Sequence, residues 1–530
     1  MSLRYNTSAE IKEAWEVVSA TYRTGKTRPF PFRREQLRQL YKLINENQDA
    51  FNVAMDKDLK RNKHDTYVYE ILTSLNDIAD QVANIEKWGE TEVIASGTFG
   101  GERVEIQYEP LGVALDIVPW NYPVFLAIST FAGIIGAGNC CILKPSELSP
   151  YTSQLFADLF PKYLDQSCYR VINGAVPETT QLLEYPFNQI TYTGSTPVGK
   201  IIQSAAAKHL TPVLLELGGK SPVYVAPDAD IKITALRIAV TKFFNNGQTC
   251  VTPDYILVHK KVAAAFIAEL KAVVEKNYGP DPKKSADYGR VISKNHHRRI
   301  MKLLERDAAA ELTFVTGGPK TADEEDRYIP PTVVTGFRTD KDYALMEGEL
   351  FAPVLPVIEI GSQEEAHKFI NDRPHPLAAY VFSTSAAVIA KFQKETHSGS
   401  MAANDCHITV TAPDAPFGGV GPSGMGAYHH KYGFDQFSHK KTVVIKKTSR
   451  DPLDGIRTPP GDYERTKRLV ELLILKKPPS EGYLAFKKVF SRVFRPALIT
   501  LAAAILYKRF GSGDVVKDIT VLGATLKSLL

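Results

Sequence analysis

The sequence predicts an α/β protein with a mostly parallel sheet and helices on its faces. From residue 113 onward, apolar runs of strand character alternate with stretches of helical spacing, which is the pattern of parallel strands joined by helical crossovers. The chain has 530 residues, of which 44% are hydrophobic and 23% are charged. This composition excludes a disordered chain and a collagen-like fibre, and the length allows several domains around a large core.

The alternation can be followed element by element between residues 113 and 244. Strands are expected at 113–118, 140–143, 169–172, 189–193 and 212–217, and helices at 124–137, from 150, from about 196 to 209, and at 231–244. Pro197 in a first turn, after Ser195 and Thr196, which are able to cap, marks a helix N-terminus. Because such a sheet binds ligands at the carboxyl ends of its strands, the site is expected in the loops that follow these strands.

Three motifs match known ligand sites only in part. Residues 194–200 follow the phosphate-binding P-loop, but Ile201 stands where Ser or Thr must hold magnesium, so an NTPase is excluded. Residues 419–424 fit a dinucleotide fingerprint by letter, yet Pro422 and the missing strand before it favour a loop with tight turns. The pairs at 296–297 and 429–430 are histidines without an acidic partner at metal spacing, so we expect surface histidines and no metal site.

The cysteines indicate a reducing compartment and one reactive thiol. Five cysteines are too few for a disulfide framework, and no apolar leader follows Met1. Cys140, Cys141 and Cys168 lie in or beside apolar elements, where a small buried hydrophobe is expected. Cys250 instead follows the polar turn 245–249, beside backbone N–H groups whose dipoles favour the reactive thiolate. Cys250 is therefore the candidate nucleophile.

Six blocks in order resemble the signatures of the aldehyde dehydrogenase superfamily over roughly residues 20–445. They are 119–123 (PWNYP), 144–147 (KPSE), 192–195 (YTGS), 216–222 (ELGGKSP), 246–250 (NGQTC) and 416–421 (PFGGVG). Residues 24–29 and 370–378 resemble the class 3 branch, which includes fatty aldehyde dehydrogenases, and the closest likeness is to the fungal ones. The resemblance implies a Rossmann-like NAD-binding domain (1–91 and 111–216), a catalytic domain (217–429), a bridging arm (92–110 and 430–446) and at least a dimer.

The resemblance also implies catalytic roles. Cys250 would attack the aldehyde carbon to give a thiohemiacetal, while the side-chain amide of Asn121 and the backbone N–H of Cys250 hold the oxyanion. Hydride transfer to the nicotinamide would leave a thioester, and Glu216 would activate the water that hydrolyses it to the acid. Because Glu216 is present, hydrolysis is favoured over transfer of the acyl group to coenzyme A.

By the same resemblance, a set of residues would bind NAD. Gly194, Ser195 and Gly199 would face the pyrophosphate at a helix start, Lys144 and Glu147 the adenosine ribose, and Glu349 and Phe351 the nicotinamide ribose, with Trp120 and Leu217 completing the cofactor site. A carboxylate at Glu147 repels a 2′-phosphate, which favours NAD over NADP, although class 3 relatives use both. Ala352 departs from the glycine that the family usually has there.

The C-terminal region, residues 447–530, is read separately because the resemblance fades there. Residues 451–530 hold 14 Lys and Arg against 8 Asp and Glu, and residues 496–507 carry no charge. A spanning helix needs ~20 apolar residues, so this run is too short to cross a bilayer. Upstream, basic residues alternate at helical spacing with Phe486, Val489, Phe490, Val493 and Phe494. We expect an amphipathic helix leading into a shallow membrane anchor, with residues 519–530 as a second contact; the alternative is packing on the protein or a partner subunit.

The expected function is NAD-dependent oxidation of medium- to long-chain aliphatic aldehydes to acids at an intracellular membrane. The endoplasmic reticulum, the mitochondrial outer membrane and the lipid droplet stay open as its location. One alternative is an aromatic substrate such as a hydroxybenzaldehyde, and another, of a different class, is a membrane scaffold that keeps the fold without catalysis. Nucleic-acid binding is not expected, because the basic residues lie among apolar ones in the tail.

Overall fold

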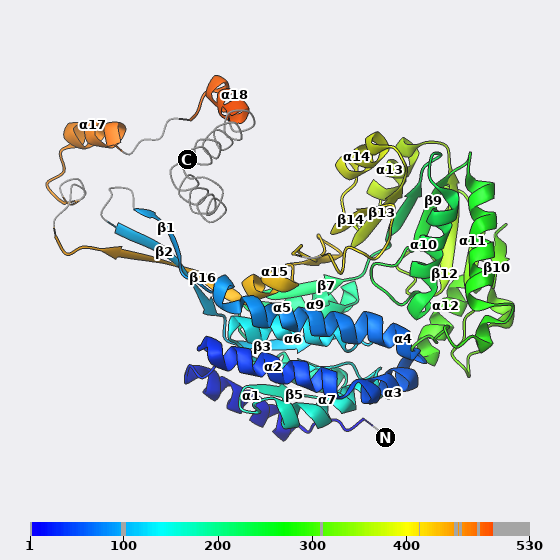
Figure 1. The fold of residues 1–530 in the computed structure, drawn as a ribbon, viewed down its shortest axis with the longest axis horizontal. Helices are drawn as coiled ribbons and strands as arrows, with labels where there is room; N and C mark the ends of the chain where they lie inside the picture. The colour runs from blue at the N-terminus through cyan, green and yellow to red at the C-terminus, as the bar shows by residue number, and fades with distance from the viewer. Residues whose placement is uncertain are drawn as a thin grey trace, which may run out of the picture. The chain divides into compact units, whose positions relative to one another are not determined.

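The structure is a computed structural model, and it describes residues 3–96, 102–307, 311–412, 414–449, 454, 458–473 and 478–490. The chain divides into two units, one of residues 1–94 and 105–443 and one of residues 95–104 and 444–530. The first unit holds two large sheets with their covering helices (Figure 1).

The first sheet has six strands in the order β15-β7-β6-β3-β4-β5. Its strands are β3 (Val113–Ile117), β4 (Cys140–Lys144), β5 (Tyr169–Val171), β6 (Gln189–Gly194), β7 (Val213–Leu217) and β15 (Gly424–Met425). Strands β3 to β7 run parallel to one another, while β15 pairs with β7 in the antiparallel sense. Every residue of β3 and β4 is buried, as expected for parallel strands covered on both faces.

Helices cover this sheet on both faces. They are α1 (Ser8–Arg23), α2 (Phe30–Glu46), α3 (Gln48–Leu59), α4 (Lys63–Thr66), the π-helix η1 (Tyr67–Leu72), α5 (Thr73–Trp88), α6 (Phe125–Ala137), α7 (Pro150–Tyr163), α8 (Val176–Leu182), α9 (Thr196–Ala207) and α15 (His430–Gln436). Figure 1 shows α2, α5 and α6 side by side, and these helices are in contact. All residues of α6 are buried, because it packs against strands on one side and helices on the other.

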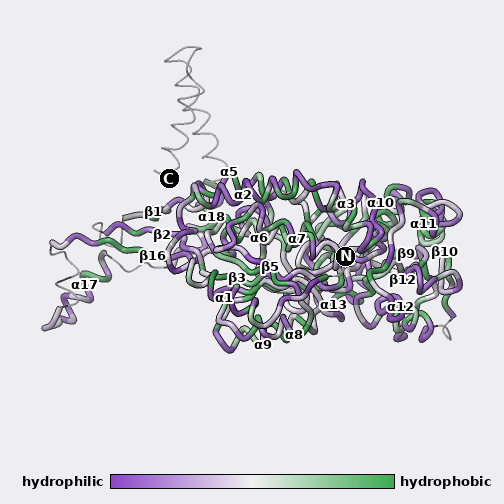
Figure 2. Tube along the Cα trace, turned by 90° about the horizontal axis from the view of Figure 1, so that it is seen from below, coloured by the Kyte–Doolittle hydropathy of each residue, from purple (hydrophilic) through white to green (hydrophobic). Residues whose placement is uncertain are grey.

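The second sheet has seven strands in the order β10-β11-β12-β9-β8-β13-β14. Its strands are β8 (Pro222–Val225), β9 (Tyr255–His259), β10 (Thr313–Thr316), β11 (Thr332–Phe337), β12 (Val354–Ile360), β13 (Ala378–Phe382) and β14 (Ser400–Ala403). Its helices are α10 (Ile231–Phe243), α11 (Ala263–Tyr278), α12 (Lys294–Arg306), α13 (Gln363–Asn371) and α14 (Ala386–Glu395), with short 3-10 turns η2 (Phe244–Gly247), η3 (Pro282–Lys284), η4 (Pro319–Thr321) and η5 (Ala344–Met346). Only β10 runs antiparallel to its neighbour among the pairs described. Hydrophobic and hydrophilic residues alternate along the trace, as elements with one buried side require (Figure 2).

The remaining strands, β1 (Glu92–Ser96), β2 (Glu102–Pro110) and β16 (Ser438–Lys446), form a three-stranded sheet. These strands fall within the segments expected to form a bridging arm, but residues 430–436 of that expectation form helix α15, which packs on α5 and α6. The second unit also contains α17 (Tyr463–Leu473) and α18 (Glu481–Val489). Within the described residues, no helix has the length and hydrophobicity to span a membrane. The predicted anchor at 496–507 and the contact at 519–530 lie outside the described residues.

The α/β prediction is confirmed element by element between residues 113 and 244. Each expected strand and helix is present, with its ends shifted by a few residues at most, and the five strands are parallel. Residues 419–423 form the loop with tight turns that the sequence predicts, whereas the short strand β15, which begins at Gly424, was not predicted. Strand β7 ends at Leu217, and β8 begins the second sheet at Pro222. The domain boundary expected after Glu216 stays a prediction.

The surface location predicted for the histidine pairs is wrong for two of the four residues. His429 is buried, its ring stacks on Phe125, and its Nδ1 lies 2.9 Å from Ser129 Oγ. His297 is buried as well, with Nε2 3.2 Å from the carbonyl oxygen of Tyr328. The sequence signal was polarity alone, and both rings find polar partners in the core. No group of three or more metal-ligating side chains occurs among the residues that the structure describes.

Candidate active site

Cys250 lies on a sharp turn that follows helix α10. Asn245, Asn246 and Gly247 have φ angles of 48°, 54° and 66°, a left-handed run that asparagine and glycine adopt most readily. The side chain of Gln248 fixes this turn, because its Nε2 donates to the carbonyl oxygen of Arg290 at 3.0 Å and its Oε1 accepts from the backbone N–H of Ile292 at 2.8 Å. The partly exposed thiol is therefore presented by a braced turn.

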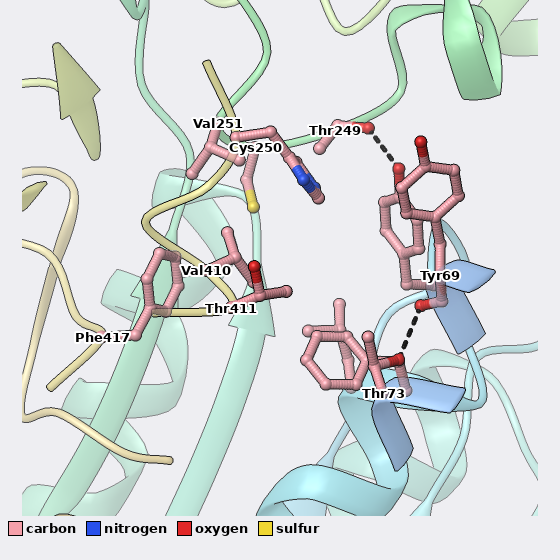
Figure 3. Close-up of a pocket in the computed structure, with 12 residues that line it drawn as sticks. Tyr69, Thr73, Thr249, Cys250, Val251, Val410, Thr411 and Phe417 are labelled. Atoms are coloured by element: carbon pink, nitrogen blue, oxygen red, sulfur yellow. Dashed lines mark hydrogen bonds between the residues drawn. The ribbon is translucent and has the colours of Figure 1, made fainter. Parts of the chain in front are cut away.

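Cys250 lines a pocket whose empty space, counted together with the part that is open to solvent, is about 440 Å³ (Figure 3). Aromatic and aliphatic side chains dominate its walls, which are formed by Tyr69, Thr73, Tyr122, Phe125, Leu126, Thr249, Cys250, Val251, His407, Val410, Thr411 and Phe417. The hydroxyls of Tyr122 and Thr249 lie 2.7 Å apart, so these two polar groups satisfy each other. The pocket thus offers an apolar chamber that ends at a nucleophile.

Asn121 lies directly beside the Cys250 turn, as its predicted oxyanion role requires. Its side chain is buried, and its Nδ2 donates to the carbonyl oxygen of Gln248 at 3.1 Å. Its own carbonyl oxygen accepts from Asn245 Nδ2 at 3.0 Å and from Arg61 at 2.6 Å. The side-chain amide of Asn121 is therefore fixed to the backbone of Gln248, two residues before Cys250 in the chain.

Glu216 lies near the end of strand β7 as a buried carboxyl with no hydrogen-bond partner for either oxygen in the described structure. Burial raises the pKa of this carboxyl well above its ordinary value. A buried polar group without hydrogen-bond partners is typical of a functional position, since water or substrate can supply the missing hydrogen bonds. A negative charge on Glu216 also raises the pKa of Cys250, so the two groups lie close enough to interact.

Glu349 is a second carboxyl at this site. A Cβ on Gly218 would lie 1.9 Å from its Oε2, so only glycine permits this approach of the carboxyl to the backbone. Burial, and then the charge of Asp254, raise the pKa of Glu349 to about 8.

Backbone dipoles were expected from sequence to favour the Cys250 thiolate, but burial raises the pKa of the thiol and Glu349 and Glu216 raise it further. Backbone N–H groups do lower this pKa, but by less, so the resting group is a thiol.

Several residues predicted to bind NAD lie at or just after the carboxyl ends of three strands of the first sheet. Lys144 ends β4, where its Nζ lies 3.3 Å from Glu147 Oε2 and 3.1 Å from the carbonyl oxygen of Pro145. Gly194 ends β6, Ser195 begins α9, and Leu217 ends β7. Because β4, β6 and β7 belong to one parallel sheet, these residues share the edge where such sheets bind nucleotides.

The start of α9 fits a pyrophosphate. Ser195 is the N-cap, yet its side chain makes no capping hydrogen bond, contrary to the capping expected from sequence, so the first N–H groups of α9 receive no bond from it. Such N–H groups bind anions. A Cβ on Gly199 would lie 2.6 Å from Leu217 Cδ2, so glycine lets the helix pack closely on β7 at this point.

The residues predicted for the nicotinamide end also come together. The rings of Trp120 and Phe351 meet edge to face with centroids 5.3 Å apart, and Phe351 has a φ of 51°, which is uncommon outside glycine. Glu349 lies two residues before Phe351 in the same segment. The carbonyl oxygen of Ala352 would lie 2.2 Å from a Cβ on Gly247, so this segment is packed against the turn that carries Cys250.

Most of the pocket wall was not found from sequence. Phe417 falls inside a signature block and Phe125 and Leu126 closely follow another, so proximity to those blocks was a usable signal. No such sequence signal marked Tyr69 or His407 as part of the pocket wall. Tyr69 reaches the pocket from the π-helix η1, and His407 has a φ of 68° in an irregular loop, two backbone features without a local sequence signature.

Comparison with known proteins agrees with this geometry. A profile of the aldehyde dehydrogenase family matches residues 1–443. The mouse (Mus musculus) protein named aldehyde dehydrogenase, dimeric NADP-preferring, is 44% identical over 441 residues, which cover 83% of this chain and 95% of the mouse protein. Mouse aldehyde dehydrogenase family 3 member A2 is 41% identical over 445 residues, 84% of this chain and 90% of its own.

A solved structure extends the match to three dimensions. Staphylococcus aureus AldH in its substrate-bound state superposes with a TM-score of 0.83 at 37% identity, covering 88% of this chain and 99% of the bacterial one. Fold and sequence therefore lead to the same family. The chain belongs to the aldehyde dehydrogenase family, and family 3 enzymes are among its relatives.

Proposed function

We propose that this aldehyde dehydrogenase oxidises medium- to long-chain aliphatic aldehydes to carboxylic acids. The observation that carries the proposal is the apolar pocket that ends at Cys250. An alkyl chain gains about 0.8 kcal/mol for each methylene that it buries in such a chamber. The resemblance of the sequence to fatty aldehyde dehydrogenases supports the same substrate class.

The protein groups account for the chemistry at the aldehyde carbon. The Cys250 sulfur adds to the carbonyl carbon as its thiol proton passes to solvent, and the Asn121 amide and the backbone N–H of Cys250 hold the resulting oxyanion. When bound, the nicotinamide cofactor accepts a hydride. Glu216 takes a proton from the water that hydrolyses the thioester, which releases the acid and restores the Cys250 thiol.

We also propose NAD as the preferred cofactor, with NADP as an alternative. Glu147 lies beside Lys144 at the adenosine end, and its carboxylate opposes a 2′-phosphate while the Lys144 ammonium attracts one. The first relative described above is named as NADP-preferring, which makes the comparison worth measuring. Glu147→Gln should lower the KM for NADP several-fold more than the KM for NAD, as read from initial rates with each cofactor.

The substrate proposal is tested by NADH formation on a ladder of straight-chain aldehydes. We expect kcat/KM to rise with chain length through the medium-chain range and to vanish at every length in Cys250→Ala. A flat or falling profile along the ladder would rule out the aliphatic assignment. The same Cys250→Ala variant also tests the non-catalytic scaffold, because a scaffold would keep its biological role without the thiol.

An aromatic aldehyde is the second candidate substrate. Tyr69, Tyr122, Phe125 and Phe417 surround the pocket, and aromatic rings stabilise one another in offset or edge-to-face contact. Benzaldehyde and a hydroxybenzaldehyde therefore belong beside the aliphatic ladder. Turnover restricted to the aromatic compounds would keep the mechanism and replace the substrate.

The C-terminal region is proposed to attach the enzyme to an intracellular membrane. Helix α18 exposes Phe486 and Tyr483 and carries Lys487 and Lys488 in its last turn, a combination suited to an anionic lipid surface. The endoplasmic reticulum, the mitochondrial outer membrane and the lipid droplet remain the candidate locations. Separately, we propose a homodimer, because the first relative described above is named as dimeric. Full-length protein should pellet with phosphatidylserine vesicles while a chain ending at residue 480 stays in the supernatant. Equal partition of the two would defeat the proposal.

A further inference from the structure

The π-helix η1 presents two consecutive residues to opposite sides of the active-site wall. Tyr69 lines the aldehyde pocket, and Glu70 next to it is fully buried. Single π-turns are uncommon and often occur at functional sites, because the wider turn redirects neighbouring side chains. A fully buried carboxyl at such a turn needs partners that account for its position.

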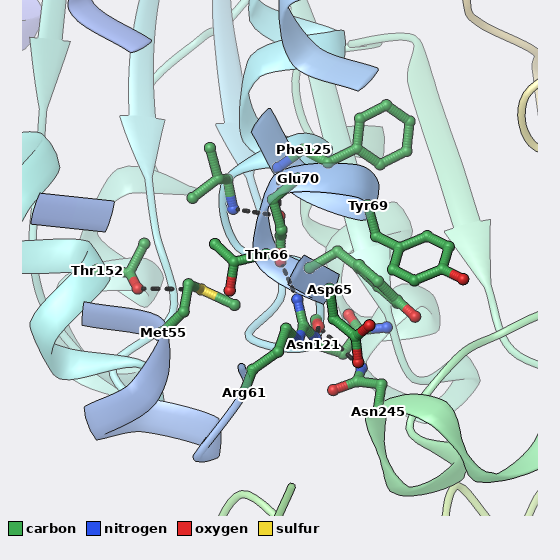
Figure 4. Close-up of polar contacts among 12 residues, drawn as sticks. Met55, Arg61, Asp65, Thr66, Tyr69, Glu70, Asn121, Phe125, Thr152 and Asn245 are labelled. Carbon is green, nitrogen blue, oxygen red and sulfur yellow. Dashed lines mark hydrogen bonds and ion pairs between the residues drawn. The ribbon is translucent and has the colours of Figure 1, made fainter. Parts of the chain in front are cut away.

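Glu70 acts as a distant cap for helix α6. Its Oε2 accepts from the backbone N–H groups of Val124 at 3.1 Å and Phe125 at 2.7 Å, at a helix start that has no side-chain cap of its own (Figure 4). Phe125 and Leu126, the first residues of α6, line the aldehyde pocket. Glu70 therefore fixes where the pocket wall begins.

Arg61 connects Glu70 to the oxyanion residue. Its guanidinium is buried, forms an ion pair with Glu70 Oε1, and donates from its other arm to the carbonyl oxygen of Asn121 at 2.6 Å. The same group lies 4.7 Å over the ring of Tyr122. Figure 4 shows Arg61 between Glu70 and Asn121. A planar fork with two separate acceptors fixes orientation in a way that a single ammonium cannot.

We propose that Arg61 and Glu70 are a positioning pair that fixes residues 121–126 against the Cys250 turn, and thereby sets both the oxyanion amide and the pocket wall. The pair touches no reacting atom and acts through Asn121 and α6. A buried ion pair contributes little net stability, but the loss of one member leaves an unpaired buried charge that reorganises its surroundings. The proposal rests on the proposed role of Asn121 but not on the aliphatic substrate.

The test compares kcat, the KM for aldehyde and the KM for NAD in Glu70→Gln, Arg61→Lys and Arg61→Met. Each variant is assayed with the aldehyde that the parent enzyme oxidises fastest. The ratio of variant to parent kcat can therefore be measured even if the preferred substrate is not an aliphatic aldehyde. We expect Glu70→Gln and Arg61→Met to lose about 10²-fold in kcat per folded enzyme with an unchanged KM for NAD. Arg61→Lys, which keeps the charge but reaches one acceptor at a time, should recover part of that loss.

Asp58 supplies a matched control. It is a buried carboxyl that caps α7 in the same way, accepting from the backbone N–H groups of Tyr151 at 3.1 Å and Thr152 at 3.0 Å, and α7 contributes nothing to the pocket. Asp58→Asn should lower the unfolding temperature while kcat per folded enzyme stays at the parent value. If Glu70→Gln and Arg61→Met also kept the parent kcat and lost only thermal stability, the pair would be structural and the proposal overturned. An inactive parent would instead refute the proposed function.

Discussion

At the scale of single residues, the resting state of Cys250 decides how the enzyme must work. Burial raises the pKa of the thiol, with Glu349 and then Glu216 adding to the effect. A nucleophilic cysteine that stays protonated is oxidised more slowly in the absence of substrate, because the thiolate is the reactive species.

This arrangement predicts slow alkylation of the resting enzyme. Iodoacetamide should modify Cys250 more slowly than a free cysteine at pH 8, and the rate should still be rising above pH 9, because the thiolate fraction stays small until the raised pKa is approached. Above pH 8, where Glu349 is ionised, Glu349→Gln removes a negative charge and should speed alkylation by roughly 2- to 10-fold. Mass spectrometry of the Cys250 peptide follows the reaction, with Cys250→Ala as the blank. Rates that level off below pH 8 in the parent would contradict the raised pKa.

At the scale of elements, the η2 turn links the nucleophile to the cofactor segment. Gly247 has a φ of 66°, and a Cβ there would meet the carbonyl oxygen of Ala352 at 2.2 Å and that of Lys242 at 3.1 Å. Both contacts are backbone, so neither can yield by a rotamer change. Gly247→Ala should cost about 1–3 kcal/mol of unfolding free energy from overpacking and φ strain, and should lower kcat because Cys250 shifts. Urea unfolding and initial rates measure the two effects. Gly279→Ala, with the same sign of φ at 73° and nothing near its Cβ, separates strain from overpacking.

The elements also show how far the sequence could predict this protein. The strands and helices between residues 113 and 244 followed from apolar periodicity, since parallel strands buried on both faces are continuous apolar runs. Strand β15 has only two residues and lies in a glycine-rich turn, so it is too short to show the alternation of apolar and polar residues that predicts a strand. Cys250 and Asn121 carried local signals, whereas the Arg61–Glu70 pair depends on contacts made across about 50 to 60 residues of chain. Tertiary contacts of that kind leave no pattern in a single sequence.

At the scale of the whole molecule, two buried carboxyls link folding to pH. Burial raises the pKa of Asp116 from 3.8 to about 8 and that of Glu349 from 4.5 to about 8. Between the ordinary and the raised values, the folded protein holds protons that the unfolded chain has released. Stability must therefore fall as pH rises through this window, the opposite of a carboxylate stabilised by a salt bridge on the surface.

Asp116 isolates this effect, because it lies in β3 away from the pocket and accepts only the hydroxyl of Thr130, at 2.6 Å, while its Oδ1 has no partner in the described structure. Unfolding free energy from urea titrations should fall between pH 5 and pH 8, and Asp116→Asn should flatten that fall by up to about 1.4 kcal/mol per pH unit, the contribution of one proton. The difference between parent and variant cancels the other titrating groups, His430 among them, whose pKa is raised by Asp80. A variant whose stability follows the same slope as the parent would mean that Asp116 is ionised in the folded enzyme. The amide that this substitution introduces cannot take up a proton, so a flattened slope assigns the proton to this one carboxyl and shows that the central strand of the first sheet is built around a neutral acid.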